Sequence, residues 1–511
     1  MNMTGGKLIG GKAANGGNVV IYHSADMNMY GGIITGGEAT TGNGGNIMSY
    51  TNASVNIHGG EISDGVSTKG YGGNIVNSTG TLRIYGGEVL GGTAATYAGS
   101  IHNAKTFYMY GGLVSGGRSG NNAGGNIMVG TGSSFNIYGG TVQNGTAPSS
   151  YGGNIQCLGT VYLCGGTIKD GTAKNGGNIA VYNKGKLYTL KSSNTREDLL
   201  VSGDTSTSGL GNSIYIGYTS ATPPTASFKW GSFLKGDIYA GPNAKVTIAE
   251  NPVIDHLMVS SGIKVTFDAF TEGGSVKVKM ADRTGVFGTG TGASLAYLTG
   301  DYEVKHEGGD LSLVAPTSFT LRYDDRKNLS DLIGTTATNV TITNQTVTSK
   351  KVGTDTTDTA VLTYDAATDT IIAVGTGTAT INAAGKSYPV TVEAAPISLL
   401  MITGHSIGEG YLADGELSVV CEAGQVYGSY GRESLTGSTG GLGYGADNRV
   451  SDSLDIYAPG NGGSASGAAG LGWRYNQLTG EKVWVLNAAV SGACINEWQP
   501  GATNHSGRYT D

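Results

Sequence analysis

The sequence predicts a mostly β protein in which a parallel β-helix precedes two smaller domains. Three observations support this fold class. First, Gly-Gly-Asn and aromatic-Gly-Gly triplets each recur at intervals of 24 to 28 residues through residues 1–180. Second, many short segments have apolar residues at alternate positions, which is typical of half-buried strands. Third, glycine becomes rarer near residue 315 while threonine and valine become more common.

Each repeat predicts one coil of a right-handed parallel β-helix, built from three short strands and glycine-rich corners. Segments such as VNIHGG and FNIYGG give one strand, and GGEISDG and GGNIVNS give the others. Because stacked strands lie about 4.8 Å apart, equivalent residues should form internal ladders. One ladder should contain Ile47, Ile75, Ile101, Ile127, Ile155 and Ile179, and another Ile62, Val89, Val114, Val142 and Ile168.

The recurring triplets have a structural explanation. Tight corners favour glycine, which adopts positive φ and leaves room for neighbouring backbone. Asparagine tolerates left-handed conformations and can hydrogen-bond along the stack. A sugar-contacting aromatic stripe is the alternative interpretation of the second triplet. The asparagine row comprises Asn18, Asn46, Asn74, Asn126, Asn154 and Asn178, with Ser100 in one copy, and the aromatic row comprises Tyr30, His58, Tyr85, Tyr110 and Tyr138, with Cys164 in the last copy.

The acidic residues of the β-helix argue against a catalytic groove. Polysaccharide lyases and hydrolases use clustered carboxylates to bind calcium or to transfer protons. Glu61 and Glu88 share one register and Asp64 and Asp170 another, but no row gathers three carboxylates. The repeat is clear in residues 1–190 and degenerate afterwards. We therefore assign residues 1–314 to the β-helix.

Residues 315–395 are expected to form a small β-sandwich. Within them, AVLTYDAATDTIIAVGTGTATINAAGKSYPVTVEA contains strands separated by turn residues. This segment resembles bacterial group 2 immunoglobulin-like domains, in which a Gly-x-Gly-Thr-Ala-x-Ile strand precedes a valine-rich last strand. The resemblance implies a spacer or adhesion module of bacterial surface and secreted proteins, without catalysis.

Residues 396–511 contain a candidate nucleophile. In ISLLMITGHSIGEGY an apolar strand ends in a glycine-rich turn that carries Ser406, a context that can expose a serine at the carboxyl end of a strand. A second strand, KVWVLNAA, later runs into VSGACINEW. This order resembles SGNH hydrolases of the sialate O-acetylesterase and carbohydrate acetylesterase branch. The resemblance implies the front part of an incomplete α/β, flavodoxin-like esterase domain.

By this resemblance, Ser406 is the nucleophile, the backbone N–H groups of Ser406 and Gly492 belong to the oxyanion hole, and Trp498 closes the second block beside the substrate. Position 405 is His, where the family usually has Asp or Gln. The family's later Asn block and Asp-x-x-His pair have no match after Ser406, so the chain is expected to be inactive or nearly so. His405 and His505 are weaker candidates for the base, and an ordinary turn serine is the alternative interpretation.

Composition narrows the classes of partner. Lys and Arg total 31 and Asp and Glu total 38, and the net charge of −7 is spread without basic runs, which argues against nucleic-acid binding. No apolar stretch is long enough to span a bilayer. The cysteines have no metal-site or disulfide spacing, and we expect no metal and no cofactor. They are Cys157, Cys164, Cys421 and Cys494, all predicted to be free, buried thiols.

Together these features predict a modular extracellular or cell-surface bacterial protein whose partner is an acetylated glycan or a cell-surface polysaccharide. In the complete protein, a serine esterase would remove acetyl groups. A non-enzymatic adhesin or stalk is one alternative, and a glycan-binding β-helix that uses exposed Tyr108 and Tyr162 is another. The start of the sequence does not read as a signal peptide, and because it begins within a repeat we expect the native start upstream.

Overall fold

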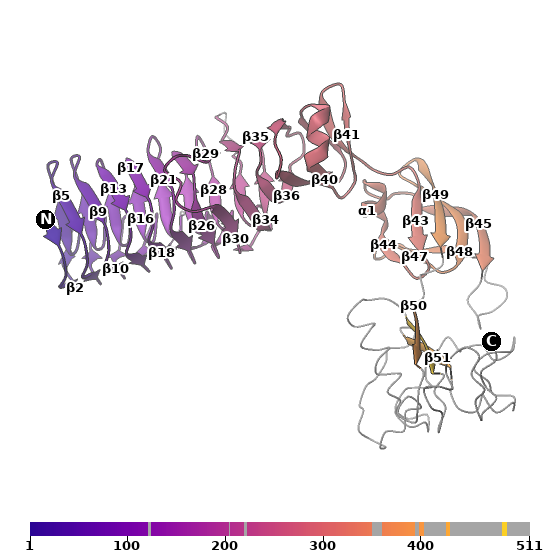
Figure 1. Cartoon of the computed structure of the whole chain (residues 1–511), viewed down its shortest axis with the longest axis horizontal. Coiled ribbons are helices and arrows are strands. Elements are labelled where there is room, and N and C mark those ends of the chain that lie inside the picture. Colours follow the sequence, from indigo (N-terminus) through magenta and orange to yellow (C-terminus); the bar gives the residue numbers. More distant parts are fainter. Residues whose placement is uncertain are drawn as a thin grey trace, which may run out of the picture. The chain divides into compact units, whose positions relative to one another are not determined.

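The computed structural model describes residues 1–120, 124–203, 205–218, 222–349 and 360–393, together with three short strands further along the chain. The chain divides into two compact units, Met1–Pro316 and Thr317–Asp511. Figure 1 shows that strands dominate the described part of both units. This confirms the mostly β fold class.

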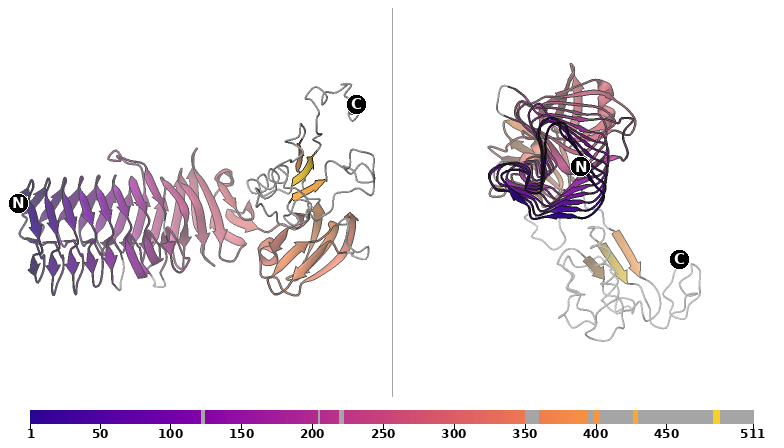
Figure 2. Two further views of the ribbon diagram at one scale, coloured as in Figure 1. Left: turned by 90° about the horizontal axis from the view of Figure 1, so that it is seen from below. Right: turned by 90° about the vertical axis from the view of Figure 1, so that its left-hand side faces the viewer.

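The first unit is a parallel β-solenoid of about 11 turns, as predicted. A regular coil consists of β8 (Ile47–Ser49), β9 (Ser54–Ile57), β10 (Glu61–Ser63) and β11 (Val66–Ser67). Each of these strands pairs in parallel with its equivalent in the next coil. Viewed from the N-terminal end, successive coils superpose (Figure 2). The prediction of three strands per coil was wrong, because β11 has only two residues and leaves no period-two signal.

One face of the solenoid is a 14-stranded sheet, parallel except at its C-terminal end. Its strands in spatial order are β1 (Asn2–Met3), β5 (Asp26–Met29), β9, β13 (Thr81–Ile84), β17 (Thr106–Met109), β21 (Ser134–Ile137), β25 (Thr160–Leu163), β29 (Lys186–Thr189), β33 (Thr225–Phe228), β35 (Lys245–Glu250), β37 (Val265–Phe270), β39 (Gly285–Thr289), β42 (Asp310–Val314) and β41 (Glu303–Glu307).

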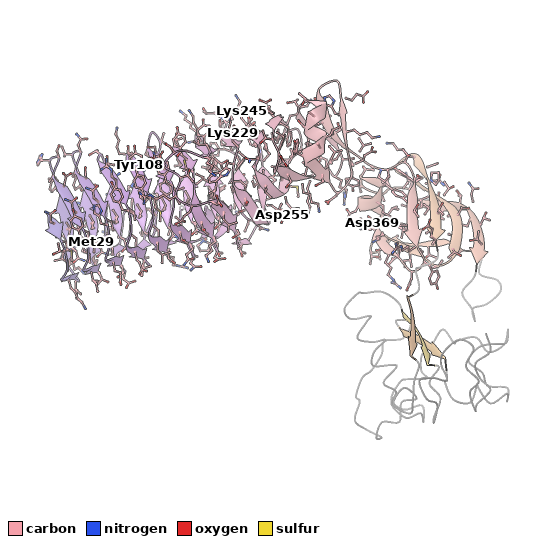
Figure 3. The ribbon with its side chains drawn as sticks, viewed as in Figure 1. Met29, Tyr108, Lys229, Lys245, Asp255 and Asp369 are labelled. Atoms are coloured by element: carbon pink, nitrogen blue, oxygen red, sulfur yellow. The ribbon has the colours of Figure 1, made fainter. Side chains whose placement is uncertain are left out.

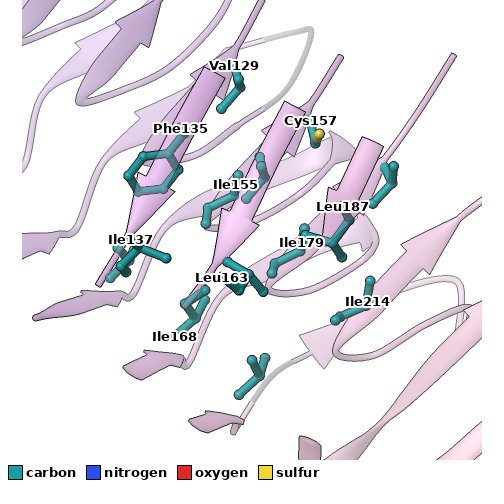
Figure 4. Packing of buried hydrophobic residues seen from close by; sticks show 14 of the residues in the cluster. Val129, Phe135, Ile137, Ile155, Cys157, Leu163, Ile168, Ile179, Leu187 and Ile214 are labelled. Atoms are coloured by element: carbon teal, nitrogen blue, oxygen red, sulfur yellow. The ribbon is translucent and has the colours of Figure 1, made fainter. Parts of the chain in front are cut away.

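The hydrophobic core lies inside the coils and contains both predicted ladders. Ile47 pairs with Ile75 and the row continues to Ile179, and the row that begins at Ile62 continues to Ile168. Figure 4 shows the first row continuing through Ile155 and Ile179 to Ile214. All of these side chains are completely buried. Each contributes about 1.5–3 kcal/mol of hydrophobic stabilisation.

Two cysteines belong to the buried part of the solenoid. Cys157 and Cys164 are free and buried, as predicted. Burial raises the pKa of the Cys157 thiol to about 12, so this thiol stays protonated and unreactive at neutral pH. Cys421 and Cys494 lie outside the described residues.

The two glycines of the Gly-Gly-Asn triplets are required for different reasons. The first glycine adopts left-handed backbone conformations, with φ of +67° at Gly124 and +70° at Gly152. The second lies against the neighbouring coil. A Cβ at Gly125 would overlap the carbonyl oxygen of Gly153 and the amide nitrogen of Thr146. The triplet therefore fixes both the bend of the corner and the close approach of successive coils.

The asparagines of the triplets form a buried hydrogen-bond ladder along the solenoid. Asn126 Nδ2 donates to Asn154 Oδ1 at 2.7 Å, and Asn154 Nδ2 donates to Asn178 Oδ1 at 2.6 Å. Asn154 Oδ1 also accepts from the Gly145 N–H, and its Nδ2 also donates to the Lys169 carbonyl. Each buried amide of this kind is satisfied on both sides. The same pattern links Asn18, Asn46 and Asn74.

The C-terminal end of the solenoid is closed by a change of strand direction. β41 and β42 form an antiparallel hairpin, and β42 pairs antiparallel with β39. An exposed parallel edge would offer unpaired backbone groups, and a hairpin across it supplies the cap that a solenoid end requires.

Two sheets in the second unit enclose a separate hydrophobic core. Leu321, Leu362, Ile371 and Ile381 are buried in it. The resemblance to immunoglobulin-like modules stays a prediction. A mixed sheet runs in the order β43 (Phe319–Arg322), β49 (Lys386–Glu393), β48 (Thr376–Ala383), β45 (Thr341–Ser349), and an antiparallel sheet in the order β44 (Arg326–Asn328), β47 (Thr370–Ala373), β46 (Leu362–Asp365), with helix α1 (Leu329–Ile333) following β44.

A small parallel sheet contains both strands predicted around the Ser406 region. Its order is β50 (Ser398–Ile402), β52 (Val483–Asn487), β51 (Val426–Ser429). Ile402 pairs with Asn487, so β50 and β52 end at the same edge. The rest of the predicted esterase domain lies outside the described residues and stays a prediction. Within the described part of the chain, no helix is both long and apolar enough to cross a bilayer.

Candidate glycan-binding face

The outer face of the 14-stranded sheet carries three rows of side chains parallel to the solenoid axis. The alternation of buried and half-buried residues along β9, β13, β17, β21 and β25 creates these rows. From β9 to β25 the rows are a hydroxyl row of Ser54, Thr81, Thr106, Ser134 and Thr160, a central row of Asn56, Arg83, Tyr108, Asn136 and Tyr162, and a corner row of His58, Tyr85, Tyr110, Tyr138 and Cys164.

The corner row is a continuous stack of rings. Tyr30 and His58 lie 4.7 Å apart between ring centroids, and the separations along the row extend to 5.3 Å between Tyr110 and Tyr138. Neighbouring rings in such a stack cover each other's faces and stabilise the corner by about 0.5–1.5 kcal/mol per pair. This geometry favours the structural interpretation of the aromatic triplets over a sugar-contacting stripe, since mainly ring edges remain for a ligand.

The central row differs because Tyr108 and Tyr162 flank the smaller Asn136. Tyr108 pairs with Asn136, and Asn136 pairs with Tyr162 on the next strand. The two tyrosines are therefore two strand spacings apart, about 10 Å. The Arg83 guanidinium lies 5.8 Å from the Tyr108 ring centroid on the preceding strand, and Tyr188 stacks on Tyr162 at 5.5 Å from the following strand. Among the described residues, no other ring lies between Tyr108 and Tyr162.

The charge of this face is low. From β9 to β25 the three rows contain one arginine and one histidine and no carboxylate. Apart from the buried Cys164 thiol, their remaining polar groups are hydroxyls and amides, which both donate and accept hydrogen bonds. Tyr108 is half-buried and lies along the same edge of the solenoid as Lys229 in Figure 3. Such a surface suits a neutral, hydroxyl-rich polymer and has no acid or base pair for hydrolysis.

A strap formed by residues 191–198 lies across one end of the corner row. The Arg196 N–H donates to the Tyr138 carbonyl at 2.9 Å, and its guanidinium lies 5.5 Å from the Tyr110 ring centroid. Glu197 Oε2 accepts from the Gly140 N–H at 3.1 Å. Tyr30 and Tyr85 remain exposed, so the strap covers only the C-terminal part of the row.

Other chemically active side chains in the described part of the solenoid do not form a catalytic or metal site. Glu61 and Glu88 pair in register as predicted, but no group of three His, Cys, Asp or Glu residues in the described chain could hold a metal ion. His102 stacks against Tyr71 at 4.9 Å, and burial lowers the pKa of its imidazole to about 4. This histidine is therefore uncharged at neutral pH.

The residues predicted for the esterase, Ser406, Gly492 and Trp498, lie outside the described residues. The nearest described strands are β50, which ends four residues before Ser406, and β52, which ends five residues before Gly492. Tyr108 and Tyr162, predicted from the sequence to be exposed glycan contacts, are both half-buried because neighbouring strands flank them, and they lie in one row with Asn136 between them. Sequence reasoning missed Asn136, although the repeat register could have identified it.

The chain matches no protein-family model, no curated protein and no solved structure. Its class is therefore defined by geometry alone, as a parallel β-helix protein with a second β-rich unit.

Proposed function

We propose that the solenoid binds a neutral polysaccharide along the outer face of the 14-stranded sheet, as part of a protein that acts outside the cell or at its surface. The observation that carries this proposal is the central row, in which Tyr108 and Tyr162 flank Asn136, within three rows that contain no carboxylate from β9 to β25. A sugar ring between the tyrosines would meet aromatic carbon on both sides and an amide beneath. The hydroxyl row would bind neighbouring sugar hydroxyls.

The rigidity of the face supports this proposal. The central row is held by parallel pairing from β9 to β25, and inward residues on the same strands, such as Phe107 and Val161, are completely buried. Preformed surfaces lose little conformational entropy on binding. A repeating polymer also suits a repeating row, since one strand spacing recurs along the axis.

The double substitution of Tyr108 and Tyr162 by alanine is expected to weaken polysaccharide binding about tenfold. Each aromatic contact is worth about 0.5–1.5 kcal/mol, and 1.4 kcal/mol corresponds to a factor of ten. The measurement is affinity electrophoresis of the full chain in gels that contain xylan, mannan or β-glucan, each with and without acetyl groups.

A matched control is the double substitution of Tyr22 and Tyr50, a stacked pair at a different corner with centroids 4.9 Å apart. This variant should keep full binding. Equal losses in both variants, or retention of binding without Tyr108 and Tyr162, would contradict the proposal. The thermal unfolding temperature of each variant separates a binding defect from a folding defect.

We propose as a second function that Ser406 is the nucleophile of a carbohydrate O-acetylesterase. The support is the resemblance of the two sequence blocks together with the parallel pairing of β50 and β52, since the carboxyl ends of adjacent parallel strands share one edge. In that arrangement Ser406 would attack the ester carbonyl, and the N–H groups of Ser406 and Gly492 would stabilise the oxyanion.

The esterase proposal predicts that ester hydrolysis by Ser406 depends on a histidine that acts as its general base. Because no Asp-x-x-His follows Ser406 in the sequence, the 511-residue chain and its Ser406→Ala variant should hydrolyse 4-nitrophenyl acetate equally slowly. A chain extended by a segment with that pair should gain hydrolysis that Ser406→Ala removes. Hydrolysis by the extended chain that does not depend on Ser406 would reject the assignment. Activity of the present chain that His505→Ala removes would identify a local base instead.

A further inference from the structure

A hollow of about 210 Å³ lies beside Trp230, outside the face described above. Its lining includes Trp230, Asp198, Ser232 and Asn251. These residues come from the strap, from the start of β34 (Ser232–Ala240) and from the residues that precede β36 (Val253–Val259). The hollow therefore lies at the corner that follows β33 and β35, where the sheet passes into the neighbouring one.

The backbone around the hollow is fixed by core contacts. Gly231 has φ of +103°, and a Cβ there would overlap the side chain of Leu199, which is almost completely buried. The N–H groups of Lys229 and Trp230 both donate to Thr189 Oγ1, at 2.9 and 3.1 Å. Trp230 also packs against the hydrophobic core. The indole is thus held by the solenoid.

The strap contributes both a wall of the hollow and a cover for the indole. Asp198, at the C-terminal end of the strap, lines the hollow, and the Lys191 ammonium lies 5.5 Å from the Trp230 ring centroid. Between these two residues the strap is anchored on the corner row through Arg196 and Glu197. These contacts of Arg196 and Glu197 hold both ends of the strap, Lys191 and Asp198, beside Trp230.

The polar groups at the hollow are available to a ligand. The side chains of Asp198 and Asn251 make no hydrogen bond or ion pair with the described protein, and both residues are exposed. A carboxylate accepts two or more hydrogen bonds, and an amide both donates and accepts. A carboxylate, an amide and a hydroxyl beside an indole match the alternating hydroxyl groups and apolar C–H face of a sugar ring.

Size and charge define the ligand class further. The hollow is smaller than the roughly 300–1,000 Å³ of typical small-molecule sites, which limits the occupant to one small ring. The charges around it are of both signs in equal number, since Lys229 pairs with Glu250 at 3.1 Å, the Lys191 ammonium lies at the Trp230 ring, and Asp198 lines the hollow. Because positive and negative side chains offset each other here, the site does not favour an acidic sugar over a neutral one.

We propose that this hollow binds a single neutral sugar ring, as a free monosaccharide or as the end of a glycan chain, with Trp230 as an apolar wall and Asp198 and Asn251 as its hydrogen-bonding groups. The site is separate from the polysaccharide face, and either can exist without the other.

The test is titration of the full chain with glucose, galactose, mannose, xylose and N-acetylglucosamine, followed by tryptophan fluorescence and by calorimetry. At least one sugar should give a saturable response. Asp198→Ala and Asn251→Ala should each weaken that response at least fivefold, and Trp230→Phe should remove the fluorescence component. Because Asp198 and Asn251 are exposed, these two variants test the site even if Trp230 variants fold poorly.

Two controls separate this site from the proposed face. Asp26→Ala, at an exposed position far along the sheet, should leave the monosaccharide response unchanged. The Tyr108 and Tyr162 double substitution should also leave it unchanged while it weakens polysaccharide binding. The proposal is overturned if none of the five sugars gives a saturable response, or if the response persists in both Asp198→Ala and Asn251→Ala.

Discussion

Substitution of Gly125 by alanine is expected to lower the free energy of unfolding by at least about 3 kcal/mol. The new Cβ would overlap the Gly153 carbonyl oxygen and the Thr146 amide nitrogen. Both atoms are themselves hydrogen-bonded within the backbone, since the Thr146 N–H donates to the Gly117 carbonyl and the Gly153 carbonyl accepts from the Asn126 N–H. No side-chain rotation can relieve the overlap, so two coils must move apart and lose these bonds.

The matched control is Gly130→Ala. Gly130 is also buried, but a Cβ there would meet its nearest atom, the Asn103 carbonyl oxygen, at 3.4 Å, which is an ordinary contact. We expect a change of less than about 1 kcal/mol, because alanine fits and reduces the freedom of the unfolded chain. Urea denaturation followed by circular dichroism measures both variants. Equal stabilities would show that coil spacing does not depend on the second glycine of the triplet.

Substitution of Asn154 by alanine is expected to destabilise the solenoid by about 3 kcal/mol or more. It removes the hydrogen-bond partners of the Gly145 N–H, the Lys169 carbonyl, Asn126 Nδ2 and Asn178 Oδ1. Asn154 is completely buried, so water cannot replace the lost amide without opening the coil. Each buried polar group left without a partner costs about 1–3 kcal/mol.

The control for this prediction is Asn28→Ala. Asn28 also belongs to an asparagine ladder, since it donates to Asn2 Oδ1 and accepts from Asn56 Nδ2, both at 2.9 Å. That ladder lies on the outer face, where water can hydrogen-bond the remaining amides. We expect a loss below about 0.5 kcal/mol. Hydrogen exchange at the Gly145 amide should rise in the Asn154 variant only, and similar losses in both variants would contradict a role for burial.

These two predictions explain why the proposed binding face is rigid. In a solenoid each coil contacts only its neighbours, so stability is approximately a sum of coil and interface terms. The glycines set the spacing of the coils and the buried amides hold their register. Because Tyr108, Asn136 and Tyr162 lie on neighbouring paired strands, this spacing and register also fix the positions of these three residues.

Much of the solenoid could be predicted because its signals are local and periodic. The interval between triplets fixes which residues stack, and the ladders from Ile47 and Ile62 follow directly. The end cap of the solenoid does not follow from the repeat. The antiparallel pairing of β41 and β42 depends on contacts across the end of the solenoid, and no repeat encodes it.

The candidate sites were predictable to different degrees. Tyr108 and Tyr162 occupy equivalent repeat positions, so the register of the repeat is enough to place them in one row. The hollow at Trp230 lies where the repeat is degenerate, and its members come from three separate segments, 198–199, 230–232 and 251–253. The strap has no repeat counterpart, and its anchors on Tyr138 and Gly140 could not be inferred from spacing.

By itself, the sequence determined the coil, its corners and the residues that stack inside it, because glycine geometry and alternating apolar residues act over a few neighbouring positions. Only the tertiary structure decided that aromatic rings cover each other along the corner, and that one strap contacts both the Tyr110 ring and Trp230. These arrangements depend on distances between coils, which spacing along the chain does not contain.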